Sequence, residues 1–596
     1  MEPNKMEKKI KGGFLVEEIF TRMFTIMLLG MITMILCNLV DSVVTGQFLG
    51  SKAVAAMGLV NPVIPLISLV TSLFVSGTSQ LCTMNMGKAN LDRVNQIFSA
   101  MAVCSVGLCL LSGILLFVFA PAYVSAVAKN VDGEVVRMAV EYLRGYSLIL
   151  LPMGICSLLN ALMVLDNDQK RSMGFALMMF FLDLIFDLLN VLVLHGGMLG
   201  MALASSFSCI LSMFYLLLHF KNPGHLLKFN LQNLFFGDVK EVLTYGVAGA
   251  VPMLMNSARS ACFNFVLLKA GGVDAVAAFS VAGGAFMLII SLISSVQSTT
   301  ATVSSLSFGE EEPADLERIL KKSFAFSYRV YLVYGLILFV FAGFIVRIFL
   351  RDPSVEADQM AVMIIRFMAV SNIFSIASYS ISGSFTGTGH VRQSYIFSVL
   401  RDGLYPCLSV LALGLTFGMH GIYFSMPVAG LLTFVTCFVI PGIFNRRRPA
   451  HIRDLLILPE GFRLDGNELF EASVRTMEEA LQASRDAYDF CLARGEDKKT
   501  AGFVSLFIEE MAGNTVSYGF EKTRDGHVEV KLILKEGKRM IRLKDNGIPF
   551  DPVKWLEQNR SDDPEESLGI RMIVALARQI YYVPAMGINS LIVNLP

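Results

Sequence analysis

The chain has 596 residues, of which 54% are hydrophobic and only 16% are charged, and its 49 basic residues balance its 49 acidic residues. Soluble globular chains are about a quarter charged, so most of this chain is expected to lie in lipid. The zero net charge offers no bulk attraction for nucleic acid, so no nucleic-acid partner is expected. The ten cysteines include no CxxC pair, which argues against a zinc site or a disulfide framework.

A polar segment at 1–19 precedes two sets of six apolar stretches, each long enough to span a membrane. The two sets define a first lobe at 20–230 and a second lobe at 231–445. The expected spans are 20–48, 54–78, 96–121, 136–162, 171–195, 198–220, 240–270, 274–306, 321–350, 358–386, 392–416 and 419–445.

Positive charge is concentrated in alternate connections between these spans. Lys88 and Arg93 lie in one such connection, and Lys170 and Arg171 lie in another. Lys and Arg are retained on the cytoplasmic side of a membrane. The chain is therefore expected to cross the inner (cytoplasmic) cell membrane many times, with both termini in the cytosol.

The two sets of spans are similar in sequence. The segment Gly50–Ala56 (GSKAVAA) matches Gly272–Ala278 (GVDAVAA) at an offset of 222 residues, and the same offset carries Gly87 onto Gly309. An even number of spans in each copy gives both copies the same orientation. This pattern predicts a parallel repeat with a central site between two bundles and alternating access by rocking.

A motif at the end of the first span carries a family resemblance. Asp41-Ser-Val-Val-Thr-Gly46 is followed by Leu49-Gly50, Ala53-Val-Ala-Ala56 and Asn61-Pro62. This string resembles the first helix and following loop of the multidrug and toxic compound extrusion (MATE) transporters, over about residues 15–445. The resemblance implies proton- or sodium-coupled antiport of organic cations or other amphiphiles across the lipid bilayer.

Three acidic residues of the first lobe lie within apolar runs. Asp41 is in the first span, and Asp183 and Asp187 are four residues apart in the fifth, which places them on one helix face. A carboxylate in hydrocarbon is costly unless it faces a cavity, a partner or a bound cation. The three residues therefore indicate a shared cation or proton site, although hydrogen bonding within the bundle is the alternative.

The family often has Asn and Asp at this spacing in the fifth helix and a hydroxyl in the sixth. Asp183, Asp187 and Ser205 match these positions, so the resemblance implies a transport cation site made of Asp41 and these three residues. Asp183 stands where the family has Asn, which adds a charge and leaves H⁺ or Na⁺ open as the coupling ion. The 222-residue offset places no carboxylate at the equivalent positions of the second lobe.

The composition changes to mixed charge after the last span, with an expected linker at 446–464 and an expected domain at 465–596. Helical periodicity and strand alternation predict an α/β sandwich with a hairpin. The expected helices are 467–495, 498–519 and 568–579, and the expected strands are 527–534, 539–544 and 590–595.

Three short motifs follow one another in this domain. They are Glu510-Met-Ala-Gly-Asn514, Asp545-Asn-Gly547 and Ser567-Leu-Gly569. In this order and spacing they resemble the ATP-binding fold shared by gyrase, Hsp90, histidine kinases and the anti-sigma serine kinases (the GHKL fold). The string from Asp545 to Pro552 most resembles the anti-sigma kinase branch.

The resemblance implies a role for each motif residue. Glu510 would be the general base, and Asn514 would bind Mg²⁺. Asp545 would bind the adenine amino group, Gly547 would let the backbone approach the base, and Gly569 would admit the phosphates of ATP.

Departures from these patterns leave several functions open. Ser567 stands where the GHKL family usually has glycine, so a degenerate domain that lacks turnover is one alternative. No GxxxxGK[ST] loop is present, which argues against an ABC-type pump. Only His451 precedes the domain closely, so a receptor kinase would need an acceptor on another protein.

The sequence thus predicts an all-α membrane protein of about twelve transmembrane helices in two six-helix pseudo-repeats, followed by a cytosolic GHKL-type α/β sandwich. The predicted function is cation-coupled export of small amphiphilic or cationic substrates. ATP and Mg²⁺ in the tail would regulate transport, or support ATPase or Ser/Thr kinase activity on a cytosolic protein partner. The alternatives are a flippase for lipid-linked or amphiphilic cargo, and a receptor kinase that uses the transporter half as a sensor.

Overall fold

The structure is a computed structural model that describes residues 13–60, 63–128, 132–221, 224–349, 355–459, 462, 468–520, 525–535, 538–559 and 568–595. Contacts divide the chain into two compact units. The helical unit comprises Met23–Glu310 and Ile319–Ile457. The sheet unit comprises Met1–Arg22, Glu311–Arg318 and Leu458–Pro596.

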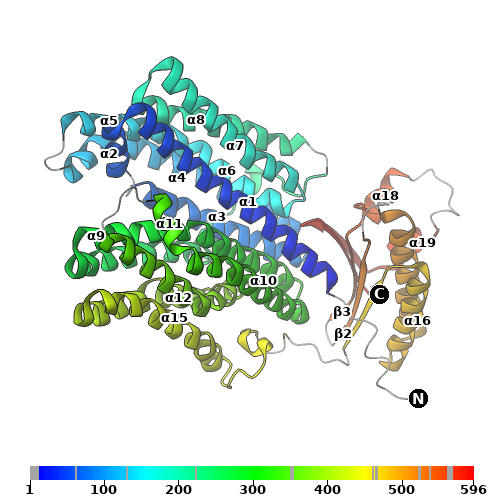
Figure 1. Ribbon diagram of the computed structural model, residues 1–596. Helices are drawn as coiled ribbons and strands as arrows, with labels where there is room; N and C mark the ends of the chain where they lie inside the picture. The colour runs from blue at the N-terminus through cyan, green and yellow to red at the C-terminus, as the bar shows by residue number, and fades with distance from the viewer. Residues whose placement is uncertain are drawn as a thin grey trace. The chain divides into compact units, whose positions relative to one another are not determined.

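The helical unit is a bundle of long helices (Figure 1), two of which, α1 and α10, begin within the sheet unit. The helices are α1 (Phe14–Val44), α2 (Ser51–Val60), α3 (Val63–Gly87), α4 (Leu91–Val127), α5 (Gly133–Tyr146), α6 (Leu150–Leu165), α7 (Gln169–Leu189), α8 (Gly197–Leu217), α9 (Val239–Gly309), α10 (Pro313–Val340), α11 (Ala342–Phe349), α12 (Val355–Gly387), α13 (Val391–Ser398), α14 (Tyr405–Ser409) and α15 (Leu415–Phe444).

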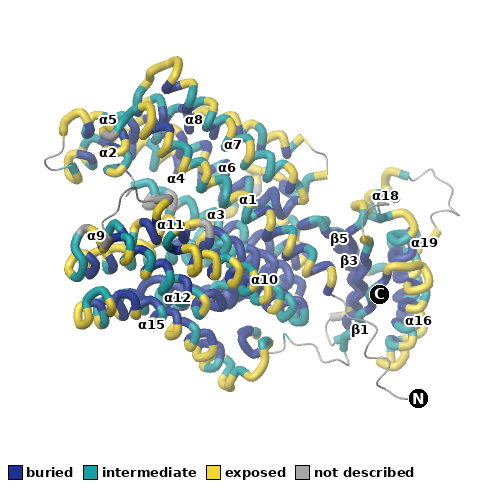
Figure 2. The backbone as a smooth tube through the Cα atoms, viewed as in Figure 1, coloured by how far each residue is buried: buried dark blue, intermediate teal, exposed yellow. Residues whose placement is uncertain are grey.

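The outer surfaces of these helices are apolar. On α4, Leu111, Ile114 and Val118 are each more than half exposed, and on α10 Leu332 is 70% exposed. Figure 2 shows exposed positions recurring along the helices of this unit. Water does not favour such continuous apolar faces, so these helices are built for contact with lipid.

Among the described residues, eight helices are long and apolar enough to cross a membrane, or nine if the bent pair Asp274–Met287 and Ile289–Gly309 forms one span. Two of the long helical stretches each contain two of the expected spans. One is α9, with 71 residues and a non-helical Gly272, and the other is Val391–Phe444, with a non-helical Gly418. Both glycines have a positive φ, of 67° and 60°, a conformation that glycine adopts without a steric penalty.

Helices α3 and α9 pack closely at glycines. A Cβ atom added to Gly77 would lie 2.0 Å from the carbonyl oxygen of Val242, and one added to Gly309 would lie 2.1 Å from that of Met84. Any larger residue at these positions would push the two backbones apart. Small residues at helix crossings are what allows such approach within membranes.

The sheet unit contains a five-stranded antiparallel sheet in the order β1-β2-β3-β5-β4. Helices of the same unit include α16 and α19, which Figure 1 labels. The elements are β1 (Leu469–Val474), α16 (Met477–Ala493), α17 (Lys498–Phe507), β2 (Val528–Lys535), β3 (Lys538–Asp545), α18 (Pro552–Gln558), α19 (Leu568–Leu576), β4 (Gln579–Ala585) and β5 (Ile588–Asn594).

One face of the sheet packs into an apolar core with the helices. Val530 and Leu532 of β2 and Leu543 of β3 belong to this core, together with Phe507 of α17. These strand residues alternate with charged ones, as expected for side chains that point to opposite faces of a sheet. The strands expected at 527–534 and 539–544 are confirmed as β2 and β3.

Two expected elements of this unit are wrong in part. The helix expected at 467–495 begins only at Met477, because Leu469–Val474 pairs with β2 as strand β1. The Thr476 side chain accepts a hydrogen bond from the Glu479 N–H and caps the start of α16. The helix expected at 568–579 ends at Leu576, because Gln579 already begins strand β4, which the sequence did not reveal.

Candidate ion site and candidate nucleotide site

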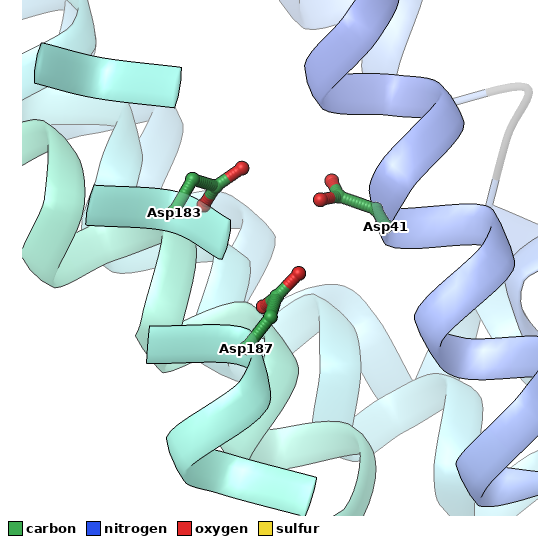
Figure 3. A group of neighbouring side chains, drawn as sticks. All are labelled: Asp41, Asp183 and Asp187. Carbon is green, nitrogen blue, oxygen red and sulfur yellow. The ribbon is translucent and has the colours of Figure 1, made fainter. Parts of the chain in front are cut away.

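The three acidic residues singled out in the first half of the chain lie together. Asp41 is on α1, and Asp183 and Asp187 are one turn apart on α7 (Figure 3). A carboxylate oxygen of each lies within 4.8 Å of one from each of the other two. Asp183 is 3% exposed and Asp187 is fully buried.

These carboxylates are poorly satisfied by the protein. One oxygen of Asp41, one of Asp183 and both of Asp187 are buried without a hydrogen-bond partner among the described residues. Ser205 of α8 is also buried and interacts with Asp183. Three ionised carboxylates this close repel one another strongly at low dielectric constant. The cluster therefore needs protons or a bound cation, and its oxygen ligands suit a hard cation.

Both acidic helices widen directly after the cluster. A π-helical turn at Thr45–Leu49 follows Asp41, and another at Asn190–Leu194 follows Asp187. Asn190 fixes the second turn, because its side chain donates to the Gly197 carbonyl at 3.1 Å. Such local π turns occur frequently at functional sites.

The positions 222 residues further along the chain have no acidic group. Phe263 stacks on Phe279 with ring centroids 5.1 Å apart, and the Tyr405 hydroxyl lies 2.8 Å from that of Thr436. The third position is Ser409. The two halves of the chain are thus chemically different at this site.

In the sheet unit, Asp545 ends β3 and is 6% exposed. Its Oδ1 accepts hydrogen bonds from the Gly547 N–H at 2.8 Å and from the Asn589 amide at 2.7 Å. Both bonds go to Oδ1. Burial raises the pKa of Asp545 to about 6, although these two donors oppose the shift.

The sequence did not identify Asn589 as a site residue. Asn589 lies directly opposite Asp545 in the β3–β5 pairing, and its amide also donates to the Gly547 carbonyl at 3.1 Å. The Tyr582 hydroxyl donates to the Asn589 side-chain oxygen at 2.9 Å and holds the amide in this orientation. Only the register of the sheet connects these residues, since no short motif contains them.

Two of the remaining predicted site residues, Glu510 and Asn514, lie in the helical segment that continues directly from α17, and Gly569 lies in α19. Glu510 lies in a π-helical turn at Ile508–Ala512, and Asn514 directly precedes a second one. A Cβ atom added to Gly569 would lie 2.2 Å from the Glu510 carboxyl carbon, so these two residues are adjacent. Burial, with a further contribution from Glu509, raises the pKa of Glu510. Ser567 lies outside the described residues.

The architecture and the two sites define a class of protein, namely a multi-pass membrane transporter that carries an appended nucleotide-binding domain. Comparison with protein-family models supports both parts of this description. The MatE model matches residues 27–189 and 250–411, more than half of the chain, so the chain belongs to the MatE family. The histidine kinase-like ATPase domain model matches residues 470–592, and a domain of this type implies ATP binding.

Individual relatives match the membrane half. The probable multidrug resistance protein NorM of Thermotoga maritima is 23% identical over 431 residues, which cover 69% of this chain and 89% of that protein. A MATE crystallised with MaL6 aligns with a TM-score of 0.67 and 20% identity over 72% of this chain and 97% of that one. An outward-facing multidrug resistance MATE transporter of the MOP superfamily aligns with a TM-score of 0.64 and 21% identity over 73% and 98%. The membrane half thus has the MATE fold.

The raised pKa of Asp545 predicts a pH-dependent gain in stability for Asp545→Asn. The folded pKa of about 6 exceeds the ordinary value of 3.8, so ionisation of Asp545 destabilises the fold above pH 6, and this cost fades as the pH falls. The stability of the variant relative to wild type should therefore be greater at pH 7.5 than at pH 5, by about 1 kcal/mol.

The fluorescence of Trp555 measures this effect, because it is the only tryptophan of the chain and lies on α18. Thermal unfolding of the full-length protein would be followed at both pH values. Gln482→Ala, on the exposed side of α16, is the control and should show the same difference from wild type at both. A pH-independent effect of Asp545→Asn would contradict the prediction.

Proposed function

We propose that the chain is a cation-coupled antiporter, driven by H⁺ or Na⁺, that exports organic cations or other amphiphiles by alternating access and is regulated through an ATP-binding tail. The observation that carries this proposal is the cluster of Asp41, Asp183 and Asp187, with Ser205 beside it. Membership of the MatE family supports a small-molecule substrate.

The chemistry of the cluster supports coupling. Two buried carboxylates and the half-buried carboxylate of Asp41 repel one another strongly without a counter-charge, so release of a proton or Na⁺ leaves the cluster strongly attractive to the next cation. Ion binding would draw Asp41 of α1 towards Asp183 and Asp187 of α7, and ion release would let the helices separate. Alternating access needs a local event of this kind that favours one arrangement of helices over another.

We further propose twelve spans. A straight 71-residue helix would be about 107 Å long, whereas the hydrocarbon core is about 30 Å thick, so α9 fits a membrane only as two spans that meet at Gly272. Gly418 would divide Val391–Phe444 in the same way.

The backbone supports two pseudo-repeats within these spans. Positive φ angles, uncommon outside glycine, recur at the 222-residue offset found in the sequence. The family model also matches twice at nearly this separation. The paired positions are Gly50 and Gly272, Ala89 and Glu311, and Asn167 and Gly389.

We place both termini and the ATP-binding domain in the cytosol and the chain in the inner membrane. The alternation of Lys- and Arg-rich connections supports this orientation. A cytosolic domain would also meet ATP and any cytosolic protein on which it acts.

In the tail, we propose that ATP binds with Mg²⁺. Asp545 would accept from the adenine amino group, and Gly547 would let the base approach. Asn514 would offer an amide oxygen to Mg²⁺, Gly569 would admit the phosphates, and Glu510 would act as general base. The adjacency of Glu510 and Gly569 supports a role for both near the phosphates. Either ATP hydrolysis or Ser/Thr phosphorylation of a cytosolic protein fits these roles.

The antiport proposal predicts that Asp41→Asn abolishes coupled transport while the protein still folds, because Asn cannot exchange a proton and weakens a cation site. Purified protein would be reconstituted in liposomes, and H⁺ and Na⁺ fluxes driven by lipophilic organic cations, starting with tetraphenylphosphonium, would be recorded. Asp92→Asn, exposed at the start of α4, is the matched control and should transport like wild type.

Undiminished ion flux in Asp41→Asn would overturn the antiport mechanism. Counterflow of a labelled organic cation distinguishes an antiporter from the two alternative functions, a flippase and a receptor kinase. Its absence in wild type, together with movement of a labelled lipid-linked cargo, would favour a flippase. The absence of both would favour a receptor whose transporter half only senses.

The Mg²⁺ assignment predicts that Asn514→Ala weakens binding of Mg·ATP about tenfold more than binding of metal-free ATP, because only the former uses the amide oxygen. Calorimetry of the full-length protein with and without Mg²⁺ measures both affinities. Gln482→Ala, which also removes an amide, should change neither. Equal weakening of the two nucleotide forms would contradict the assignment.

A further inference from the structure

The face of the β2–β3 hairpin that points away from the apolar core is charged and yet buried. Lys531 is paired directly opposite Arg542, and Glu529 is opposite Lys544. These side chains are only 3–6% exposed, and β2 is buried along almost its whole length (Figure 2). Charged residues are rarely buried without a partner, so this face is built to hold something of complementary charge.

An acidic segment of the sheet unit supplies that charge. Glu312 bridges two cations, with Oε2 2.6 Å from the Lys531 ammonium and Oε1 3.0 Å from the Arg542 guanidinium. Asp315 lies 3.4 Å from Lys531 and 3.7 Å from Lys544. Like charges directly opposite on neighbouring strands repel each other, so the Lys531–Arg542 pair depends on the carboxylate that lies between them.

The same face also holds the start of α1. Oε1 of Glu529 accepts hydrogen bonds from the backbone N–H groups of Gly13, at 2.5 Å, and Leu15, at 3.3 Å. A carboxylate is favourable at a helix N-terminus, where N–H groups have no partner within the helix. The Asn546 amide adds a hydrogen bond of 2.9 Å to Glu18.

The charged groups of this face shift one another's pKa values. Burial alone would lower the pKa of Lys531, but the carboxylates of Asp315 and Glu312 raise it above its usual value. Burial alone would raise the pKa of Glu312, but Lys531 and Lys544 hold it below its usual value. Both groups are therefore ionised at neutral pH, and their attraction is fully available.

Strand β3 links this face to the candidate nucleotide site. Lys544 points to the charged face, and its neighbour Asp545, the proposed adenine contact, points to the opposite face. Asn546, which binds Glu18, comes next in the chain. A shift of the strand end on nucleotide binding would thus reach the charged face through one or two residues.

We propose that Glu529, Lys531, Arg542 and Lys544 form an intramolecular docking surface for the acidic segment Glu311–Arg318 and the start of α1, and that nucleotide at Asp545 changes the strength of this docking. Glu311–Arg318 contains the end of the connection from α9 and the first residues of α10, and α1 carries Asp41. The surface therefore holds the beginnings of two transport helices. The second part of this inference rests on the proposed binding of ATP.

Because the effect of ATP on docking and the effect of docking on ATP binding are reciprocal, the inference can be tested by changing either the nucleotide or the docking contact. If ATP changes the docking equilibrium of Glu311–Arg318 by some factor, then the docked and undocked forms must differ in ATP affinity by the same factor, and such factors are about 5-fold or more. Glu312→Gln removes the bridging charge but keeps the shape of the side chain. It lies far in sequence from every proposed nucleotide ligand, so its effect on ATP affinity would report coupling.

The experiment uses full-length protein in detergent, with amide hydrogen exchange of residues 311–318 and calorimetric ATP affinity as readouts. Glu312→Gln should speed exchange of the segment and shift the ATP affinity towards that of the undocked form, and ATP should change the exchange of the wild-type segment about 5-fold or more. The charge swap Lys531→Glu with Glu312→Lys should restore slow exchange relative to Lys531→Glu alone. Lys554→Gln, whose side chain is 72% exposed, is the control and should change neither readout.

Each other outcome is decisive. If wild type binds ATP but neither ATP nor Glu312→Gln changes the exchange or the affinity, the contact is static and the inference is overturned. If wild type binds no ATP, the proposed nucleotide function fails and the coupling is overturned with it. In that case faster exchange in Glu312→Gln would still support the docking surface, and unchanged exchange would overturn it as well.

Discussion

Mutual repulsion of buried carboxylates is the constraint on which the rest of this account depends. Asp41, Asp183 and Asp187 bring three acidic groups within 4.8 Å of one another in a lipid-facing bundle, where the burial of Asp183 and Asp187 limits screening of their charges by water. Such a cluster is stable only with protons or a cation, so its occupancy and the helix arrangement are linked. On our proposal, transport uses this linkage: an ion stabilises one arrangement, and its loss favours the other.

The same physics explains the sheet unit with the signs reversed. Lys531 and Arg542 are buried side by side, and Glu312 compensates both. Removing one member of a buried ion pair usually costs several kcal/mol, because the remaining charge is left without a partner. On our proposals, charge makes two places in this chain sensitive to their occupants: the carboxylate cluster to a transported ion, and the face of the β2–β3 hairpin to Glu311–Arg318.

The grouping of the acidic residues could be predicted where chemistry and local spacing coincide, although their role stays a proposal. Asp183 and Asp187 were identifiable because two acids at helical spacing in an apolar run have few explanations, and the structure places Asp41 beside them. Asn589 could not be identified, because it meets Asp545 only through the pairing of β3 with β5. Burial of the charged face of β2 could not be predicted either. Apolar and charged residues alternate along a strand in the same way whether the charged face contacts water or a docked segment.

The most direct test counts the ions displaced when an organic cation binds. Tetraphenylphosphonium would be added to purified full-length protein in weakly buffered detergent solution, with a pH dye and a sodium-selective electrode as detectors. We expect release of about one H⁺ or Na⁺ for each organic cation bound by wild type, and little release from Asp41→Asn. Binding by wild type with no release of either ion would contradict the exchange of ions at the carboxylate cluster.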